Sequence, residues 1–187
     1  MKHLLRRMMS VAAAVVLGVT GTLVVAGPAA AATFPNTPKI SSAMKACASA
    51  GCLTVASALK GPPPDALTDF CRRGTWDMVF NRSAARHAGF VQRSTLTFTD
   101  QFTDCATGGL FNAVTANTAM RTCANTACTL LNTTTPPNNL RDYCWQFGTA
   151  VQGNTVWHLI YNASVGVVGF LPEAALQNAN RFDRCDD

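Results

Sequence analysis

The sequence predicts an all-β protein built from two tandem small β-barrels, each pinned by disulfides, after a cleaved signal peptide. Three observations support this fold class. The chain contains an internal repeat with four cysteines in each copy. Short apolar segments recur at roughly 8–12-residue spacing between Gly, Pro and Asn turns, which is typical of small barrels. After the first 32 residues, no stretch keeps the 3.6-residue apolar period of a helix.

The repeat pairs residues 47–105 with residues 123–185. Both copies contain, in the same order, a Cys-x4-Cys pair, a proline pair before Leu-x-Asp-aromatic-Cys, Trp-x3-aromatic-Asn, Gly-Phe, a leucine and a final cysteine. One sizeable gap is needed to align them, because the chain runs five residues from Cys71 to Trp76 but thirteen from Cys144 to Trp157. The second copy therefore has an insertion in front of its tryptophan.

Residues 1–32 have the composition of a secretory signal peptide. Lys2, Arg6 and Arg7 form a positive start, an apolar stretch follows over residues 11–26, and alanines at 30–32 resemble a cleavage site. A transmembrane anchor is the alternative, but the stretch is short for a span of about 20 residues, contains Gly18 and Gly21, and is followed directly by Gly27. We expect a secreted, extracellular protein that can associate with the cell wall, with no stable membrane anchor.

The charge of the mature chain is nearly balanced. The full sequence has 15 basic and 10 acidic side chains, and three of the basic ones lie in the signal segment, which leaves 12 against 10, or +2. This balance does not favour nucleic acid as a partner, because electrostatic binding to phosphates needs a clustered excess of Lys and Arg.

All eight cysteines lie after the signal segment, four in each repeat. An even count in an exported chain indicates disulfides, and staples suit repeats of only about 60 residues. A zinc site built from four thiolates is the competing interpretation, but the oxidising compartment favours disulfides. Four cysteines allow three pairings within a repeat. The predicted disulfide residues are Cys47, Cys52, Cys71, Cys105, Cys123, Cys128, Cys144 and Cys185.

The mature chain divides into four segments. Residues 33–45 are expected to be a flexible leader and residues 46–105 the first repeat, with a linker at 106–121 before the second repeat at 122–187. In the first repeat, strands are expected near 52–56, 67–71, 76–80 and 89–92, and Leu96 follows a short helical turn. The prolines at 62–64 exclude a regular element there. The second repeat predicts strands near 129–131, 140–145, 156–161 and 165–171.

The stretch from Trp76 to Leu96, like that from Trp157 to Leu176, resembles the second half of bacterial SH3-like (SH3b) domains, with Phe90 and Phe170 where that family more often has Trp. The first halves lack the family's usual Leu-Asn-Val-Arg-Ser-Gly-Pro run. The second repeat further resembles the disulfide-bearing versions secreted by actinobacteria. In that type the mid-domain cysteine pairs with the last one. The resemblance therefore implies Cys71–Cys105 and Cys144–Cys185, which leaves Cys47–Cys52 and Cys123–Cys128.

No catalytic motif is present in the sequence, and we expect no enzyme, no cofactor and no metal site. If every cysteine is paired, none is free to act as a nucleophile with a histidine. His87 and His158 do not recur between the repeats, and surface positions are expected for them. Of the acidic residues, only Asp69 and Asp142 match, and each is expected to make a turn hydrogen bond beside its cysteine.

The aromatic residues are the better candidates for a ligand contact. The pairs Trp76/Phe80 and Trp157/Tyr161 are spaced i and i+4 on predicted strands, so each pair shares one face. That face is either the barrel core, which we favour, or an exposed groove for an extended peptide. Trp145 has Arg72 as its counterpart and should be the more exposed tryptophan of the second repeat. The candidate ligand-binding residues are therefore Trp145, Trp157, Tyr161, Trp76 and Phe80.

Two functions fit these features. The first is a secreted, non-catalytic binding protein whose two SH3-like modules contact cell-wall peptide or glycan, where tandem copies would gain avidity. The second is a protein–protein effector or inhibitor acting on an extracellular protein. Its natural contact would be a disulfide-pinned Pro-rich loop at residues 62–64 or 136–137, because proline lowers the ordering cost of binding.

Overall fold

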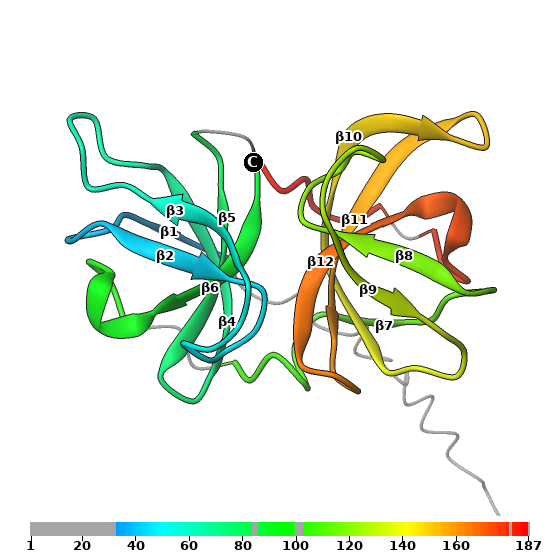
Figure 1. Ribbon diagram of the computed structural model, residues 1–187, viewed down its shortest axis with the longest axis horizontal. Coiled ribbons are helices and arrows are strands. Elements are labelled where there is room, and N and C mark those ends of the chain that lie inside the picture. Colours follow the sequence, from blue (N-terminus) through cyan, green and yellow to red (C-terminus); the bar gives the residue numbers. More distant parts are fainter. Residues whose placement is uncertain (1–32, 84–85, 100–102, 180, 187) are drawn as a thin grey trace, which may run out of the picture.

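The computed structural model describes residues 33–83, 86–99, 103–179 and 181–186. The predicted signal peptide, residues 1–32, lies outside these ranges. Over the described residues the protein is all-β, with two six-stranded sheets and two short 3-10 helices (Figure 1). No helix in these ranges is long and apolar enough to cross a membrane. The all-β prediction is confirmed.

The two sheets have the same strand order. The first sheet is ordered β1-β4-β5-β6-β2-β3 and the second β7-β10-β11-β12-β8-β9. The strands of the first sheet are β1 (Phe34–Asn36), β2 (Ser42–Lys45), β3 (Thr54–Ala58), β4 (Leu67–Arg73), β5 (Trp76–Asn81) and β6 (Ala88–Gln92). Those of the second are β7 (Leu110–Asn112), β8 (Thr118–Arg121), β9 (Leu130–Thr134), β10 (Leu140–Val151), β11 (Asn154–Asn162) and β12 (Val167–Pro172). A 3-10 helix follows β6 and β12, η1 (Arg93–Thr95) and η2 (Glu173–Ala175) respectively.

Each structural repeat begins earlier than expected. Residues 33–45, expected to be a flexible leader, contribute β1 and β2, and residues 106–121, expected to be a linker, contribute β7 and β8. A buried asparagine explains why the first strand is part of the sheet. Asn36 donates to Asp69 of β4 at 3.3 Å, and Asn112 donates to Asp142 of β10 at 3.0 Å. The two asparagines therefore tie matching outer strands to matching central strands.

The Gly-Phe motif of each repeat has a packing reason. A Cβ atom on Gly89 would lie 3.0 Å from the carbonyl oxygen of Lys45 in β2, and one on Gly169 would lie 2.8 Å from that of Arg121 in β8. The Gly89 Cβ would also lie 2.9 Å from Val55 Cγ2, so a side chain at either position would force its neighbours to shift. Glycine therefore lets the last long strand of each repeat approach its neighbouring strand closely.

Each sheet encloses an inner apolar cluster on one face. On β5, Val79 points to that cluster, while Met78 and Phe80 point to the opposite face, as the two-residue period of a strand requires. The inner cluster of the first sheet is Met44, Ala58, Leu67, Val79, Val91 and Leu96. That of the second sheet is Val114, Met120, Leu140, Ile160, Leu171 and Leu176.

A third apolar cluster lies between the two sheets, and it contains the aromatic faces predicted from the sequence. Three aromatic pairs join the repeats edge to face, at ring-centroid distances of 5.9–6.2 Å. They are Phe70–Tyr143, Phe80–Phe170 and Phe90–Tyr161. In the repeat alignment, Phe70 matches Tyr143, Phe80 matches Tyr161 and Phe90 matches Phe170. The contact is therefore nearly two-fold symmetric, like the interface of a homodimer.

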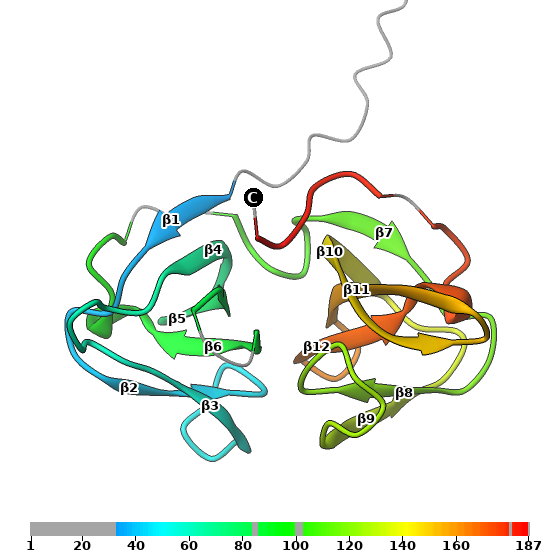
Figure 2. The ribbon, with the colours of Figure 1, turned by 90° about the horizontal axis from the view of Figure 1, so that it is seen from above.

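This cluster corrects the sequence-based interpretation of the aromatic face. Phe80, Trp157 and Tyr161 are almost fully buried, so they do not line an exposed groove. They also do not belong to either inner cluster. The expected choice between barrel core and groove left out a third arrangement, in which the apolar faces of the two repeats bury each other. Figure 2 shows the two sheets side by side, and β6 of the first contacts β12 of the second.

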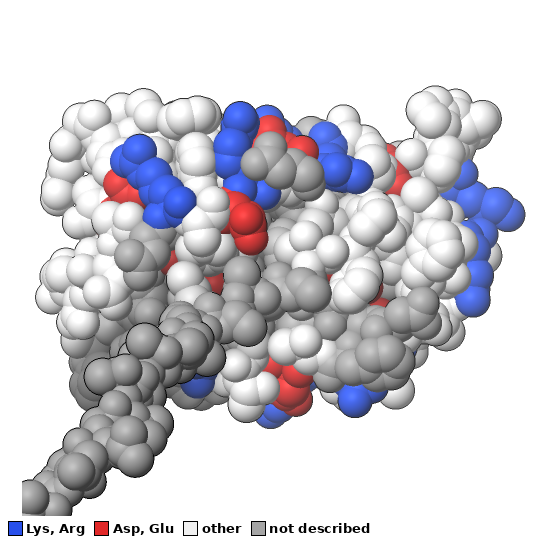
Figure 3. All heavy atoms as spheres, turned by 180° about the vertical axis from the view of Figure 1, so that it is seen from behind, with Lys and Arg blue, Asp and Glu red and all other residues white. Residues whose placement is uncertain are grey.

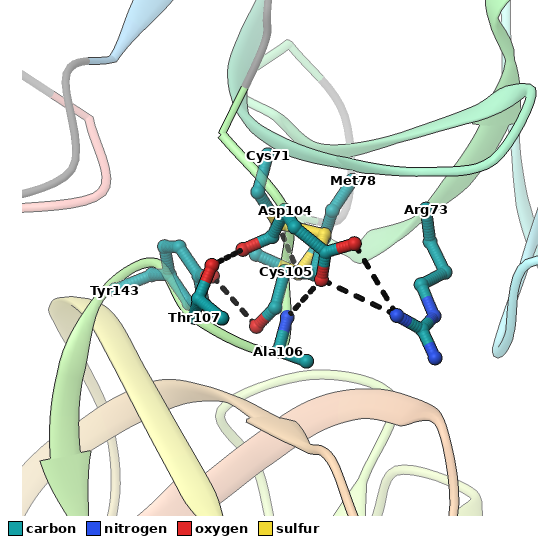
Figure 4. The surroundings of a disulfide bond; sticks show 8 residues. All are labelled: Cys71, Arg73, Met78, Asp104, Cys105, Ala106, Thr107 and Tyr143. Carbon is teal, nitrogen blue, oxygen red and sulfur yellow. Dashed lines mark hydrogen bonds and ion pairs between the residues drawn. A yellow bond between two sulfur atoms is a disulfide. The ribbon is translucent and has the colours of Figure 1, made fainter.

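All four predicted disulfides are present, and all lie within a repeat: Cys47–Cys52, Cys71–Cys105, Cys123–Cys128 and Cys144–Cys185. The bond between Cys71 and Cys105 lies at the repeat contact (Figure 4). There, Tyr143 of the second repeat donates its hydroxyl to the carbonyl oxygen of Cys105 at 3.0 Å. Asp104 orders the same turn by accepting from the backbone of Ala106 at 2.7 Å and by pairing with Arg73 at 3.3 Å.

Ionisable side chains are buried inside both repeats. His158 is fully buried, which corrects the expected surface position, and its Nδ1 and Nε2 lie 2.8 Å and 3.2 Å from carboxylate oxygens of Asp142 and Glu173. Burial alone would lower the pKa of His158, but these two carboxylates outweigh it and raise the pKa. Asp69 and Asp142 also differ from expectation, because their side chains bind the buried asparagines rather than cap a turn.

The first repeat should make stability fall as pH rises. Burial and the charge of Asp77 raise the pKa of Asp69 to about 8. Burial also raises the pKa of Asp77 to about 6, although the positive charges of Arg93 and Arg72 act in the opposite direction. In the unfolded chain both carboxyls lose their protons near pH 4. Between pH 4 and their folded-state pKa values, the folded protein therefore holds more protons than the unfolded chain. The stability that the two carboxyls contribute is fully present below about pH 4 and is lost as pH rises through about 6 and about 8.

We therefore expect urea denaturation to give a lower free energy of unfolding at pH 7 than at pH 5. The slope is about 1.4 kcal/mol per pH unit for each extra proton held by the folded state. Replacing Asp69 by asparagine removes one of these protons, so the slope of the free energy of unfolding against pH should become shallower by the amount due to one proton. A free energy of unfolding that rises between pH 5 and pH 7 would show that the two carboxyls ionise normally in the folded protein.

Candidate ligand-binding site

The insertion in the second repeat lengthens one hairpin. β10 and β11 extend beyond the ends of their counterparts β4 and β5, and the turn between them uses positive φ angles at Gln152 and Gly153. The pairing shifts register between Phe147 and Val151, so the hairpin bends at that point. The sequence gap therefore corresponds to one added structural feature, a bent extension of the β10–β11 hairpin.

The extension folds over the small disulfide loop of Cys123–Cys128. Thr149 donates its backbone N–H to the carbonyl oxygen of Ala124 at 3.1 Å, and Thr126 donates to the Thr149 hydroxyl at 3.0 Å. Any Cβ on Gly148 would collide with the same carbonyl and with the indole of Trp157. Glycine is therefore required where the hairpin crosses the loop, and the disulfide keeps that loop compact.

Trp157 lies under this extension. Its indole Nε1 donates to the carbonyl oxygen of Thr149 at 2.8 Å, and the side chain is 1% exposed. Its counterpart Trp76 has no such extension above it and is only partly buried at the edge of the cluster between the repeats. The insertion thus covers one tryptophan of the pair and leaves the other at the rim.

The extension also presents an aromatic pair at the surface. Trp145 and Phe147 meet edge to face with ring centroids 5.4 Å apart, and Phe147 is 59% exposed. The guanidinium of Arg184 lies 5.6 Å from the Trp145 ring and 5.7 Å from the Phe147 ring, and that of Arg181 lies 5.9 Å from Trp145. These distances are those of cation–π contacts.

The two arginines are themselves held in place. Arg181 pairs with both carboxylate oxygens of Glu173, at 2.8 Å and 2.7 Å. These hydrogen bonds are the main reason that the pKa of Glu173 is lowered to about 2. Arg184 pairs with Asp186 at 3.1 Å. The aromatic pair therefore lies among cations whose positions are fixed by carboxylates on either side.

A hollow of about 180 Å³ adjoins this group at the junction of the two repeats. Arg86 of the first repeat contributes one wall, and its guanidinium pairs with Asp186 at 2.6 Å. The remaining walls come from the second repeat: Cys123, Ala124, Asn125, Gln146 and Phe147. Burial would raise the pKa of Asp186, but Arg86 and Arg184 outweigh it and lower the pKa. The Asp186 carboxylate is therefore ionised between two guanidinium groups.

Among the predicted site residues, Trp145 alone belongs to this group. The prediction that Trp145 is more exposed than Trp157 is confirmed. Phe80, Trp157 and Tyr161 are buried between the repeats, and Trp76 lies at the rim of that cluster. The sequence reasoning missed Phe147, Arg86 and Arg184. For Phe147 a signal was available, because it lies in the insertion two residues after Trp145.

The surface around the seam between the repeats is mixed in charge. Figure 3 shows basic and acidic side chains in small groups of both signs, separated by broad uncharged areas. Within the described ranges, no group of three His, Cys, Asp or Glu side chains could hold a metal ion. Comparisons of the chain with protein families, with curated proteins and with solved structures give no match. The function is therefore inferred from the geometry of this site.

Proposed function

We propose that the chain is a secreted, non-catalytic binding protein with two SH3-like modules, which contacts cell-wall peptide or glycan. The observation that carries this proposal is the edge-to-face pair of partly buried Trp145 and exposed Phe147, set among arginines beside the hollow between the repeats. Solvent-exposed aromatic side chains on a rigid strand bind apolar and planar groups of a ligand at low entropic cost. The arginines add donors for carboxylates.

The SH3-like assignment is part of the proposal. It is supported by the identical strand order of the two sheets and by the 3-10 turn that follows the Gly-Phe strand in each. The secreted location is supported by the four disulfides, since such bonds persist in oxidising compartments. A non-catalytic role is supported by the full burial of His158, which among the described residues is the histidine that contacts two carboxylates.

Replacing Phe147 by alanine should lower retention on purified bacterial cell wall by about tenfold, because truncating an aromatic anchor typically costs over 1 kcal/mol of binding. The melting temperature should change little, since Phe147 is 59% exposed. The matched control is Phe111→Ala, which removes an equally exposed phenylalanine, 57% exposed, that also lies near an arginine, Arg141. The measurement is the bound fraction in a cell-wall pull-down.

Three results would count against the proposal. Wild-type protein that stays in the supernatant with cell wall from several bacteria would refute wall binding. Equal loss of retention in the Phe147→Ala and Phe111→Ala variants would show that the site around Phe147 does not bind the wall. Capture of a secreted protein through the exposed Pro-rich loop at residues 62–64, with no wall retention, would favour the effector alternative.

A further inference from the structure

We propose that the hollow between the repeats is a binding site for a peptide with a free carboxylate, and that Asp186 of the same chain occupies its anion position. The inference rests on the proposed function and names the ligand class of that site. It depends on three features: two convergent guanidinium groups, buried polar atoms without partners, and one aromatic wall.

The two guanidinium groups come from different repeats. Arg86 precedes β6 in the first repeat, and Arg184 lies beside the last cysteine of the second. Both reach the same carboxylate oxygen, Asp186 Oδ2, at 2.6 Å and 3.1 Å. Arg86 adopts a left-handed backbone conformation, with φ of 55°, to do so, which is uncommon for a residue other than glycine, Asn or Asp. Two convergent guanidinium groups form a strong carboxylate-binding arrangement.

The polar atoms around the hollow match the rest of a peptide. Gln146 lines the hollow and is 1% exposed, yet its Oε1 accepts no hydrogen bond from the described residues. The Nε of Arg86, which also lines the hollow, has no acceptor within that part of the chain. The same holds for Arg184 Nε and Trp145 Nε1, whose side chains contact the lining residue Phe147. Buried polar groups are normally satisfied. A peptide group supplies both complements, an N–H for Gln146 and a carbonyl oxygen for the donors.

The size and walls of the hollow limit the ligand. A space of about 180 Å³ accommodates one or two small residues, and the Phe147 ring supplies an apolar wall beside the polar ones. A peptide end with small side chains fits this description.

Asp186 makes the site self-occupied. Its carboxylate takes the position that a ligand carboxylate would need, and the side chains of Arg86 and Arg184 are 43% and 40% exposed. Ion pairs at this level of exposure are weak, so an incoming carboxylate can displace Asp186. Asp186 therefore competes with the ligand carboxylate and lowers the apparent affinity of the site for it.

The test uses isothermal titration calorimetry of the oxidised full-length mature protein with acetyl-D-alanyl-D-alanine, once as the free acid and once as the C-terminal amide. The free acid should bind and the amide at least tenfold more weakly. Asp186→Asn should tighten binding of the free acid by about three- to tenfold, because the competing charge is gone. Arg86→Gln should weaken it at least tenfold. Arg141→Gln, which removes an arginine stacked on Phe111 elsewhere, is the control and should change nothing.

The outcomes separate this inference from the proposed function. Equal affinity for acid and amide, or an Asp186→Asn variant that binds no better than wild type, would overturn the carboxylate site. If the acid shows no binding while Phe147 still governs retention on cell wall, the inference fails and the proposed function stands. Circular dichroism of each variant must match wild type, and Arg86→Lys should recover part of the affinity because it restores the charge.

Discussion

Replacing Trp157 by alanine is expected to lower the free energy of unfolding by about 3–5 kcal/mol, a large part of the total stability of a domain of this size. The side chain is 1% exposed, packs in the cluster between the repeats, and loses its hydrogen bond to Thr149 in the variant. The cavity left behind would also loosen the hairpin extension above it. Urea denaturation followed by far-ultraviolet circular dichroism measures the loss.

The matched control is Trp145→Ala in the same protein. Trp145 is only partly buried and its ring contacts are with exposed groups, so we expect a loss of about 1 kcal/mol. The two variants thus separate a structural tryptophan from one that is available to a ligand. If Trp145→Ala proved the more destabilising change, the assignment of the two residues would have to be reversed.

Placing a charge at Phe90 should destabilise both repeats together. Phe90 is fully buried and meets Tyr161 of the other repeat at a centroid distance of 5.9 Å. Phe90→Asp would bury an unpaired carboxylate at the contact, at a cost of about 3–5 kcal/mol. In a Trp76→Phe background, the two remaining tryptophans both lie in the second repeat. Their fluorescence should therefore report a large fall in the second repeat's melting temperature.

The control for this experiment is Phe98→Asp, which places the same charge on a phenylalanine of the first repeat that is 54% exposed. It should shift neither repeat by more than a few degrees. A second repeat that melts unchanged in the Phe90→Asp variant would mean that the two sheets fold independently, and that the aromatic pairs contribute nothing to their joint stability.

The sequence predicted the individual repeats well because their constraints are local or duplicated. Cysteine spacing and the resemblance to disulfide-bearing domains led to all four bridges. The early strands β1 and β7 were missed although a signal was present. Asn112, Met120 and Cys123 each follow Asn36, Met44 and Cys47 by 76 residues, so the repeat continues upstream of the first cysteine.

The sequence analysis missed the contact between the repeats because it assumed that each strand buries only one face. Met78-Val79-Phe80 and Leu159-Ile160-Tyr161 are continuous apolar runs, and such runs indicate strands that are buried on both faces. Val79 and Ile160 account for the inner clusters, so their neighbours needed a second buried surface. The two-residue period therefore contained the information, but it did not say which partner covers the second face.

The buried ionisable residues carry a sequence signal that indicates which side chains contact each other inside each sheet. His158 and Glu173 of the second repeat replace Asp77 and Arg93 of the first, so the sign of both members is reversed. Both pairs are in contact, at 3.2 Å for His158 Nε2 to Glu173 and 3.7 Å for Arg93 Nε to Asp77. A paired exchange between copies of one repeat could have placed these residues together inside each sheet.

The candidate site was predictable only in part. The hairpin insertion and the exposed position of Trp145 follow from the alignment of the repeats. Arg86 and Asp186 are separated by the end of the first repeat, residues 106–121 and nearly all of the second repeat, and they meet because the two sheets pack on each other. Their pairing is a tertiary property that no local spacing in the sequence contains.

The contact between the repeats can be observed directly as nuclear Overhauser effects between tyrosine and phenylalanine rings in the oxidised protein, which has only two tyrosines. We expect cross-peaks from Tyr143 to Phe70 and from Tyr161 to Phe90, because the ring centroids are 5.9 Å apart in each pair. Cross-peaks that confirm the strand pairing of each sheet, together with none between these ring pairs, would show that the two repeats do not bury their aromatic faces against each other.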